Sequence, residues 1–453
     1  TAGSLTMPWE KFKTAPGSST IVACCASLAW TWALLAAARS VDFNEPYLPF
    51  AVAGAFTFYV RGKPSRWEIY IWLGLTAPFL GMVHPPQIRF WVLRVACGLS
   101  MLGLSALLLL GWRILWSAGD DRKIARSLLV PALVLIAFVA ATAWGLRWTG
   151  PLNPRTDDLW IYVFDGSLGL QPSFAIGKVM YRSLVLTRIT LLTYLSLPFV
   201  MALVCAWSIP PRPTRIHWRM LGVLLLAGAA GGLLYNVLPA TGPLYAFGRD
   251  FPWHSTPYSA LGEISLQKMS LPVGIPRNGM PSLHVAWVIL LCWNSRRLPR
   301  WLRVSMIVYA LLTVVATLGS GQHYVMDLVV SVPFALFVQA AAAWTCVSRA
   351  VRARAVSAGI TLTFFWLVLL RFGTREMLVS PVLPWTLVLA STVGSFWLES
   401  SGEKQNAPAS LAITSDSSTS ADSSAPATLA GSPGTSVDSG QRSAAKARAT
   451  AHI

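Results

Sequence analysis

A series of long apolar stretches constrains this chain more than any other feature. There are twelve, at about 20–38, 47–60, 67–83, 91–116, 127–146, 187–209, 216–238, 282–294, 301–319, 325–347, 354–370 and 379–397. A helix needs about 20 mostly apolar residues to cross the hydrocarbon of a bilayer. The stretches lack the alternation of barrel strands, so helices are expected. The sequence therefore predicts an all-α, polytopic transmembrane helix bundle of about twelve spans.

The composition excludes an ordinary soluble domain. Hydrophobic residues make up 54% of the chain and charged residues only 12%, against roughly a quarter charged in soluble proteins. The net charge of the chain is +18. In a polytopic membrane protein such an excess of lysine and arginine usually lies in cytoplasmic loops and does not indicate a nucleic-acid-binding surface. The six cysteines lie in or beside apolar runs without a CxxC spacing, which favours small hydrophobes over disulfides or zinc ligands.

Lysine and arginine alternate between the loops in a way that predicts the orientation. If the N-terminus is cytoplasmic, six short segments on that side hold eighteen basic residues, against eleven on the other side. Seven of those eleven fall in the two long loops, 147–186 and 239–281, where charge carries little information about topology. We therefore expect both termini to be cytoplasmic.

The composition also divides the chain into parts. An N-terminal transmembrane extension of about four spans covers 1–116, a core of about six spans covers 117–350, and two further spans lie within 351–398. Residues 399–453 are rich in Ser, Ala, Thr, Pro and Gly and are expected to form a disordered cytoplasmic tail. The pattern of 1–38 is compatible with either a first span or a cleaved signal peptide.

One candidate site segment leads into the tenth span with the sequence Gly-Ser-Gly-Gln-His-Tyr-Val-Met-Asp, 319–327. His323 and Asp327 are four residues apart, so they share one face if the segment is helical. A carboxylate there can accept a hydrogen bond from one imidazole nitrogen and leave the other as a nucleophile. The alternative is a structural pair at a helix start, but an ionisable group at the mouth of a span is usually functional.

A second segment leads into the eighth span with the sequence Arg-Asn-Gly-Met-Pro-Ser-Leu-His, 277–284. Ser282 is a predicted N-cap, so the first amides of the helix would form an anion site together with Arg277. His284 falls in the first turn, where it can protonate a leaving oxygen. Each residue also has a structural interpretation: a capped helix, a loop arginine and a buried histidine. By the predicted topology, both segments lie at the extracytoplasmic ends of their spans.

Together the two segments resemble a known family. G-x-P-S-L-H followed some forty residues later by H-Y-x-x-D resembles the type 2 phosphatidic acid phosphatase superfamily. The pattern is most similar to its inositol phosphorylceramide synthase-like lipid phosphotransferases. Two further stretches, 164–169 and 235–243, look like segments of that branch. The resemblance covers about 127–347 and implies a six-helix catalytic core within the bundle.

The resemblance also implies a mechanism for the matching residues. His323 would attack phosphorus to form a phosphohistidine, oriented by Asp327, while His284 would act as general acid and then as base. Ser282, the Gly279 region and Arg277 would hold the phosphoryl oxygens. The reaction would require no metal or other cofactor. The partners would be a phospholipid or lipid phosphate donor and a lipid alcohol or water as acceptor, at a membrane and without nucleic acid.

The chain departs from the phosphatase branch in its cations. It has no K-x6-R-P motif, and Thr317 stands six residues before His323, where that branch carries arginine. The phosphate charge would then be met first by Arg277, with Lys178, Arg182 and Arg249 as weaker candidates. Leu283 of P-S-L-H, where the phosphatases usually have glycine, also points to the phosphotransferase branch.

Other polar residues receive no catalytic role from the sequence. Three histidines, His84, His217 and His452, are interpreted as incidental, and His254 is only a remote candidate for the site. Three aspartates, Asp157, Asp158 and Asp165, lack matching ligands for a metal site.

The sequence leaves three functions open. The first is a lipid phosphotransferase active on the outer face of a membrane, the second a lipid phosphate or polyprenyl pyrophosphate phosphatase using the same site, and the third a transporter.

Overall fold

The computed structural model describes residues 22, 24–32, 46–82, 91–344 and 347–406. Much of the first predicted span, the possible cleavage of 1–38 and the tail beyond residue 406 lie outside the described residues. His84 and His452 lie outside them as well.

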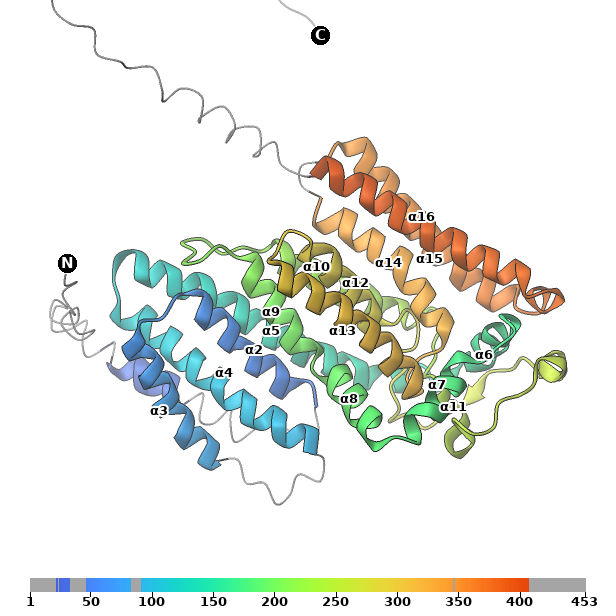
Figure 1. The fold of residues 1–453 in the computed structure, drawn as a ribbon, viewed down its shortest axis with the longest axis horizontal. Coiled ribbons are helices and arrows are strands. Elements are labelled where there is room, and N and C mark those ends of the chain that lie inside the picture. Colours follow the sequence, from blue (N-terminus) through green and yellow to red (C-terminus); the bar gives the residue numbers. More distant parts are fainter. Residues whose placement is uncertain (1–21, 23, 33–45, 83–90, 345–346, 407–453) are drawn as a thin grey trace, which may run out of the picture. The chain divides into compact units, whose positions relative to one another are not determined.

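Helices make up nearly all of the regular structure (Figure 1). In the first half they are α2 (Leu48–Arg61), α3 (Arg66–Met82), α4 (Trp91–Trp116), α5 (Gly119–Leu152), α6 (Asp158–Ser167), α7 (Pro172–Tyr181), α8 (Leu184–Leu195) and α9 (Leu197–Ser208). In the second half they are α10 (Arg219–Leu234), α11 (Pro243–Phe247), α12 (Leu283–Ser295), α13 (Arg300–Gly319), α14 (Val325–Ala342), α15 (Arg349–Phe372) and α16 (Val382–Asn406). The strands of the described residues, β1 (Arg155–Thr156) and β2 (Met269–Ser270), pair antiparallel.

Six described helices are long and apolar enough to cross a membrane. They are α4, α5, α13, α14, α15 and α16, and the bent pair of α8 and α9 would make a seventh span. The helices α2, α10 and α12 are apolar but shorter. The chain is therefore built as an all-α, multi-pass membrane protein, as the sequence predicts, whereas the count of twelve spans stays a prediction.

One predicted span, 187–209, is broken in the structure. The axis bends by 51° between α8 and α9, and Ser196 separates the two helices. Pro198 lies in the first turn of α9, where its missing N–H costs no intrahelical hydrogen bond. The proline therefore favours a new helix start within an apolar run that looks continuous in sequence.

The last helix is longer than the sequence predicts. The disordered tail was expected from residue 399, but α16 continues to Asn406. Two ion pairs hold this extension, Glu399 with Arg296 at 2.6 Å and Glu403 with Arg297 at 2.7 Å. The paired carboxylates sit on one helical face and offset a composition that otherwise favours disorder.

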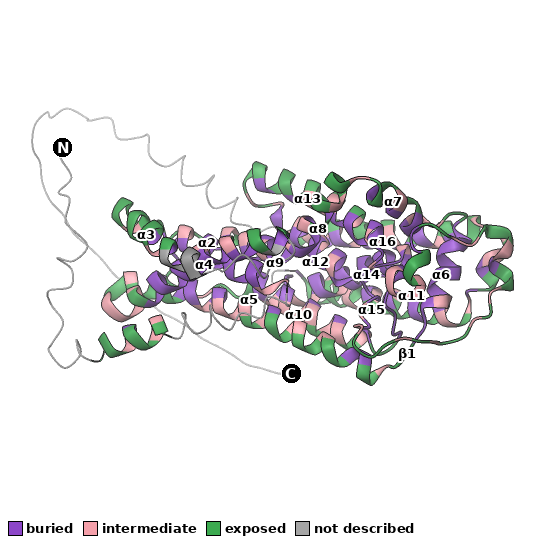
Figure 2. Ribbon diagram, turned by 90° about the horizontal axis from the view of Figure 1, so that it is seen from below, coloured by how far each residue is buried: buried purple, intermediate pink, exposed green. Residues whose placement is uncertain are grey.

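Burial separates inner helices from outer ones (Figure 2). Fourteen of the eighteen residues of α14 are buried, so this helix lies inside the bundle. In contrast, α13 exposes large apolar side chains such as Trp301, Ile307 and Leu311. A contiguous apolar surface of this kind is stable next to lipid rather than water.

A small group of short elements lies at one end of the long helices. Figure 1 shows α6, α7 and α11 together there, and β1 and β2 join the loop after α5 to the loop before α12. The sequence predicted loops over 147–186 and 239–281, so these short helices are additions to it. They position the polar site described next.

Candidate active site

The two histidines of the sequence motifs line one cavity of about 670 Å³. His284 lies in the first turn of α12, and His323 lies just before α14. Their ring centroids are 6.5 Å apart. Tyrosines contribute much of the remaining polar lining, namely Tyr47, Tyr181, Tyr194, Tyr235 and Tyr245. The fold therefore brings together two imidazoles from segments about forty residues apart.

The contacts of His323 determine which ring nitrogen carries the proton. Its Nδ1 lies 3.0 Å from the carbonyl oxygen of Gly279 and 3.2 Å from Oδ2 of Asp327. A carbonyl oxygen can only accept, so Nδ1 is the donor and the neutral ring keeps its lone pair on Nε2. Among the described residues Nε2 has no hydrogen-bond partner although it is buried. This nitrogen is therefore available for chemistry.

Burial also keeps the ring neutral. Removal from water lowers the pKa of His323 to about 4, although its hydrogen bond to the Gly279 carbonyl acts in the opposite direction. The imidazole is then uncharged near neutral pH, which a nucleophile requires. Ser173 fixes the backbone here by donating its hydroxyl to the His323 carbonyl at 3.0 Å.

His323 and Asp327 meet across a helix start rather than along a helix. The sequence placed both on one helical face, but α14 begins at Val325, with Tyr324 in an extended N-cap conformation. Asp327 also accepts a hydrogen bond from the Tyr324 backbone N–H at 2.8 Å. One carboxylate oxygen thus caps the helix and faces the imidazole, which explains why the pair survives outside regular helix geometry.

His284 is held by an aromatic stack. Its ring lies 3.9 Å from the ring of Tyr194 with an interplanar angle of 14°, and it hydrogen-bonds the Tyr194 backbone. Ser282 is the N-cap of α12, as predicted, and its hydroxyl accepts from the Val285 N–H. The cap fixes the first turn, and with it the direction in which His284 leaves the helix.

A backbone hydrogen bond joins the two motif segments directly, and a second one joins the first segment to the loop after α10. The Ser282 N–H donates to the Asp327 carbonyl at 3.1 Å, and the Gly279 N–H donates to the Ala240 carbonyl at 2.8 Å. A side chain at position 279 would clash with Ala240. The phosphate-binding role of Gly279 and Ser282 stays a prediction, and in this structure the Gly279 carbonyl and the Ser282 cap also orient the two histidines.

Asp158 ties the loop after α10 to the second motif. The carboxylate is fully buried and accepts hydrogen bonds from the backbone N–H groups of Thr241 and Gly242 and from the hydroxyl of Tyr324. Gly242 has a φ of +98°, and a Cβ there would lie 2.3 Å from the Gln322 carbonyl oxygen. Glycine is therefore required where this loop passes the His323 segment.

Asp165 caps the helix that carries Asp327. Its two carboxylate oxygens accept from the backbone N–H groups of Val325 and Met326, at 2.7 and 3.1 Å. Burial raises the pKa of Asp165 to about 8, against the lowering effect of the Val325 N–H. Asp158 and Asp165 are thus engaged in positioning α14, while Asp157 pairs with Arg371 at 2.7 Å.

Arg277 is not placed as the sequence predicted. Its side chain is fully buried, and each of its five guanidinium N–H bonds points to a backbone carbonyl. The acceptors are Asn153, Pro154, Leu271, Pro272 and Ile275. Because a guanidinium has five donors in all, none remains for a phosphate oxygen in this structure. Arg277 instead fastens the loop before α12 to the end of α5, which corrects its predicted role as first phosphate ligand.

A different arginine lines the cavity. Arg147, near the end of α5, is the one lysine or arginine among the described residues that line it. The weaker predicted candidates Lys178, Arg182 and Arg249 do not line this cavity, and neither does His254, which faces Asp250 on the surface. Asn278 also lines the cavity, and its buried Oδ1 has no partner among the described residues.

Comparison with known proteins gives one match. Residues 159–341 match the family model of the PAP2 superfamily. No curated protein and no solved structure matches the chain. The matched segment runs from α6 to α14 and includes both histidines. The match indicates a lipid enzyme of the phosphatase or phosphotransferase type that acts on phosphoesters.

Several of these contacts could not be read from the sequence. The motif residues His284, His323 and Asp327 were found because their chemistry and spacing are distinctive. The carbonyl of Gly279 carries no side-chain signal, and Arg147 looked like one of many loop cations. Only the resemblance of 164–169 and 235–243 pointed to the segments that hold Asp165 and the Asp158 partners.

Proposed function

We propose that this protein is a membrane enzyme that transfers a phosphoryl-bearing headgroup from a lipid phosphoester through a phosphohistidine. The observation that carries the proposal is the buried Nε2 of His323, which has no hydrogen-bond partner in the described part of the chain, while Nδ1 is held by two acceptors. A second imidazole faces the same cavity 6.5 Å away, measured between ring centroids. An oriented nucleophile opposite a proton donor is what two successive displacements at phosphorus need.

The reaction has two steps. In the first, the Nε2 lone pair of His323 attacks phosphorus, the bond to the leaving oxygen breaks, and His284 gives that oxygen a proton. In the second, a hydroxyl attacks phosphorus, the phosphorus–nitrogen bond breaks, and His284 takes the hydroxyl proton. Asp327 and the Gly279 carbonyl stabilise the positive charge that His323 carries between the steps.

Arg147 supports the binding of the phosphate in this proposal. A guanidinium donates paired hydrogen bonds to phosphate oxygens, and Arg147 lines the cavity that both histidines share. Asn278 is a second polar group in the same lining. These residues take the place that the sequence gave to Arg277.

The acceptor is proposed to be a lipid hydroxyl, as in the inositol phosphorylceramide synthase-like branch that the motifs resemble. Water as acceptor would give a lipid phosphate or pyrophosphate phosphatase with the same histidines. For the membrane arrangement we propose twelve spans with a six-helix core, cytoplasmic termini and an extracytoplasmic site. The charge distribution of the loops supports this orientation.

The test is product analysis with purified protein in detergent. Wild type and His323→Ala are incubated with labelled phospholipids plus ceramide or diacylglycerol. A new lipid phosphoester made by wild type and not by the variant supports the transferase. Release of phosphate or headgroup without a lipid product identifies the hydrolase. If neither reaction occurs in wild type, while transport of a lipid persists in His323→Ala, the enzyme proposal fails and a transporter takes its place.

A further inference from the structure

The cavity extends from the histidines into an apolar arm between α5 and α9. Six positions of α5 line the cavity, namely Phe138, Val139, Thr142, Ala143, Leu146 and Arg147. Their spacing places them on one face of the helix. From Phe138 to Arg147 the helix rises about 14 Å, so the lining changes along α5 from aromatic and aliphatic to cationic.

The facing wall of the arm comes from the broken span. The bend between α8 and α9 lies at Ser196, and beyond it Leu197, Pro198 and Met201 line the cavity. Tyr194, which stacks on His284, lies just before the bend. The wall is therefore polar at the histidines and becomes apolar within two turns of helix.

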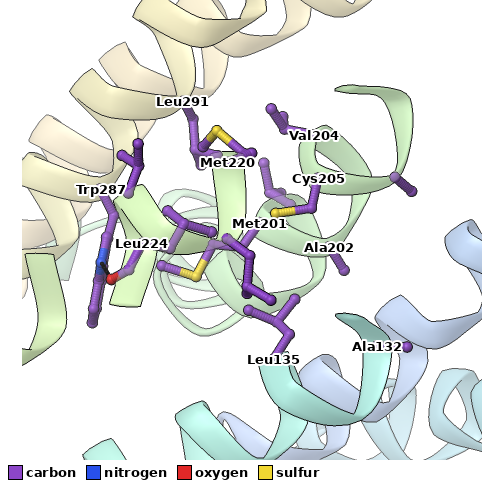
Figure 3. Packing of buried hydrophobic residues seen from close by; sticks show 14 of the residues in the cluster. Ala132, Leu135, Met201, Ala202, Val204, Cys205, Met220, Leu224, Trp287 and Leu291 are labelled. Carbon is purple, nitrogen blue, oxygen red and sulfur yellow. Dashed lines mark hydrogen bonds between the residues drawn. The ribbon is translucent and has the colours of Figure 1, made fainter. Parts of the chain in front are cut away.

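Close packing ends the arm. The ring of Phe138 meets Trp287 edge to face with centroids 5.9 Å apart, and the Trp287 indole N–H donates to the Leu224 carbonyl at 3.2 Å. Figure 3 shows Leu224 beside Trp287, and Met201 and Leu135 belong to the same hydrophobic cluster, against which Phe138 packs. Trp287, whose ring centroid is 6.5 Å from that of His284, lies in the wall between the histidines and Phe138. Phe138 and Met201 then form a floor beyond it, which we call the arm floor.

We propose that this arm holds the hydrocarbon chain next to the reacting phosphate and that the arm floor selects chain length. The inference rests on the proposed function. It specifies the hydrocarbon chain of the substrate, which the reaction at phosphorus does not define. The occupant is an alkyl or acyl chain, because the arm is apolar, continuous with the histidines and closed at its far end. A headgroup with hydroxyls or charges would lose its hydration there without gaining partners.

Turnover of two alkyl phosphates tests the arm. Butyl phosphate reaches the histidines with a chain that barely enters the arm, whereas dodecyl phosphate fills it. Ala143→Trp places an indole in the arm, and the matched control Ala137→Trp places one on the opposite, exposed face of α5. Each buried methylene contributes about fourfold in affinity. Ala143→Trp should therefore lower kcat/KM for dodecyl phosphate by about tenfold or more and that for butyl phosphate by less than about twofold.

A second variant works in the opposite direction. Phe138→Ala removes part of the arm floor and should move the preferred chain to longer alkyl phosphates. An equal loss for both alkyl phosphates in Ala143→Trp, or an unchanged length preference in Phe138→Ala, overturns the arm while leaving the phosphohistidine proposal intact.

A binding readout separates the two proposals. Dodecyl phosphate with a photoreactive group at its chain end is irradiated with wild type and with His323→Ala, and labelled residues are mapped by mass spectrometry. Labels on Phe138, Met201 or Trp287 that decrease in Ala143→Trp support the arm even if no turnover occurs. Labels elsewhere, with these residues unmodified, contradict it.

Discussion

The two ends of the cavity are stabilised by different kinds of interaction. At the histidine end, directional hydrogen bonds place each group: His323 to the Gly279 carbonyl and to Asp327, and Asp165 to the first amides of α14. At the arm floor, Phe138 and Met201 are placed by apolar contacts. Hydrogen bonds fix atoms to within fractions of an ångström, whereas packing fixes volume. The first end is therefore suited to chemistry and the second to substrate size.

This contrast leads to a general expectation for mutants. Changes at the histidine end should lower the rate for all substrates by a similar factor, because the reacting phosphate is common to them. Changes at the arm floor should alter the ratio between long and short chains. The ratio of kcat/KM for dodecyl and butyl phosphate measures which end a mutation affects.

Asp327→Asn should give the largest effect. The asparagine oxygen can still accept from the Tyr324 N–H and keep α14 capped, but the negative charge next to His323 is lost. We expect kcat/KM to fall about 100-fold for both alkyl phosphates, with thermal unfolding in detergent close to wild type. A rate equal to wild type would remove Asp327 from the mechanism, and a change in the chain-length ratio would contradict the separation of the two ends.

Acid should inhibit both substrates in parallel. The folded-state pKa of His323 is lowered to about 4, below its ordinary value near 6.5. The ring is thus neutral above that range and gains its proton as the pH falls through about 4. Well below this range, where His323 is fully protonated, kcat/KM should drop about tenfold per pH unit and by the same factor for both alkyl phosphates. Tryptophan fluorescence at each pH serves as the folding control, and a rate that does not fall once His323 is fully protonated would contradict a neutral nucleophile.

Arg147→Gln should give the smallest effect of the three. Loss of a charge-assisted hydrogen bond to the phosphate should raise KM about fivefold with kcat nearly unchanged. The same substitution at Arg277 is the informative contrast. It would remove hydrogen-bond donors from the five backbone carbonyls around Arg277 (the carbonyl cage) and should therefore lower the unfolding temperature. If Arg277→Gln instead raises KM without loss of stability, the assignment of the two arginines is reversed.

The sequence predicted the helical class and the residues with distinctive chemistry. Long apolar runs specify helices in a bilayer almost without regard to tertiary contacts, and His284, His323 and Asp327 have few alternative roles at span ends. The bend at Ser196 was missed because the run around it stays apolar. The cage around Arg277 was missed because its acceptors are backbone carbonyls from two separate segments, which leave no trace in side-chain pattern.

The carbonyl of Gly279 has a consequence for mutagenesis. It is a main-chain atom, so side-chain substitution at this position cannot delete it as an acceptor for the proton on Nδ1 of His323. Asp327→Asn leaves this acceptor in place as well. The imidazole tautomer is therefore controlled in part by a main-chain atom, and alanine scanning cannot detect this contribution. Replacement of that amide by an ester, a weaker acceptor, would be the chemical way to probe it.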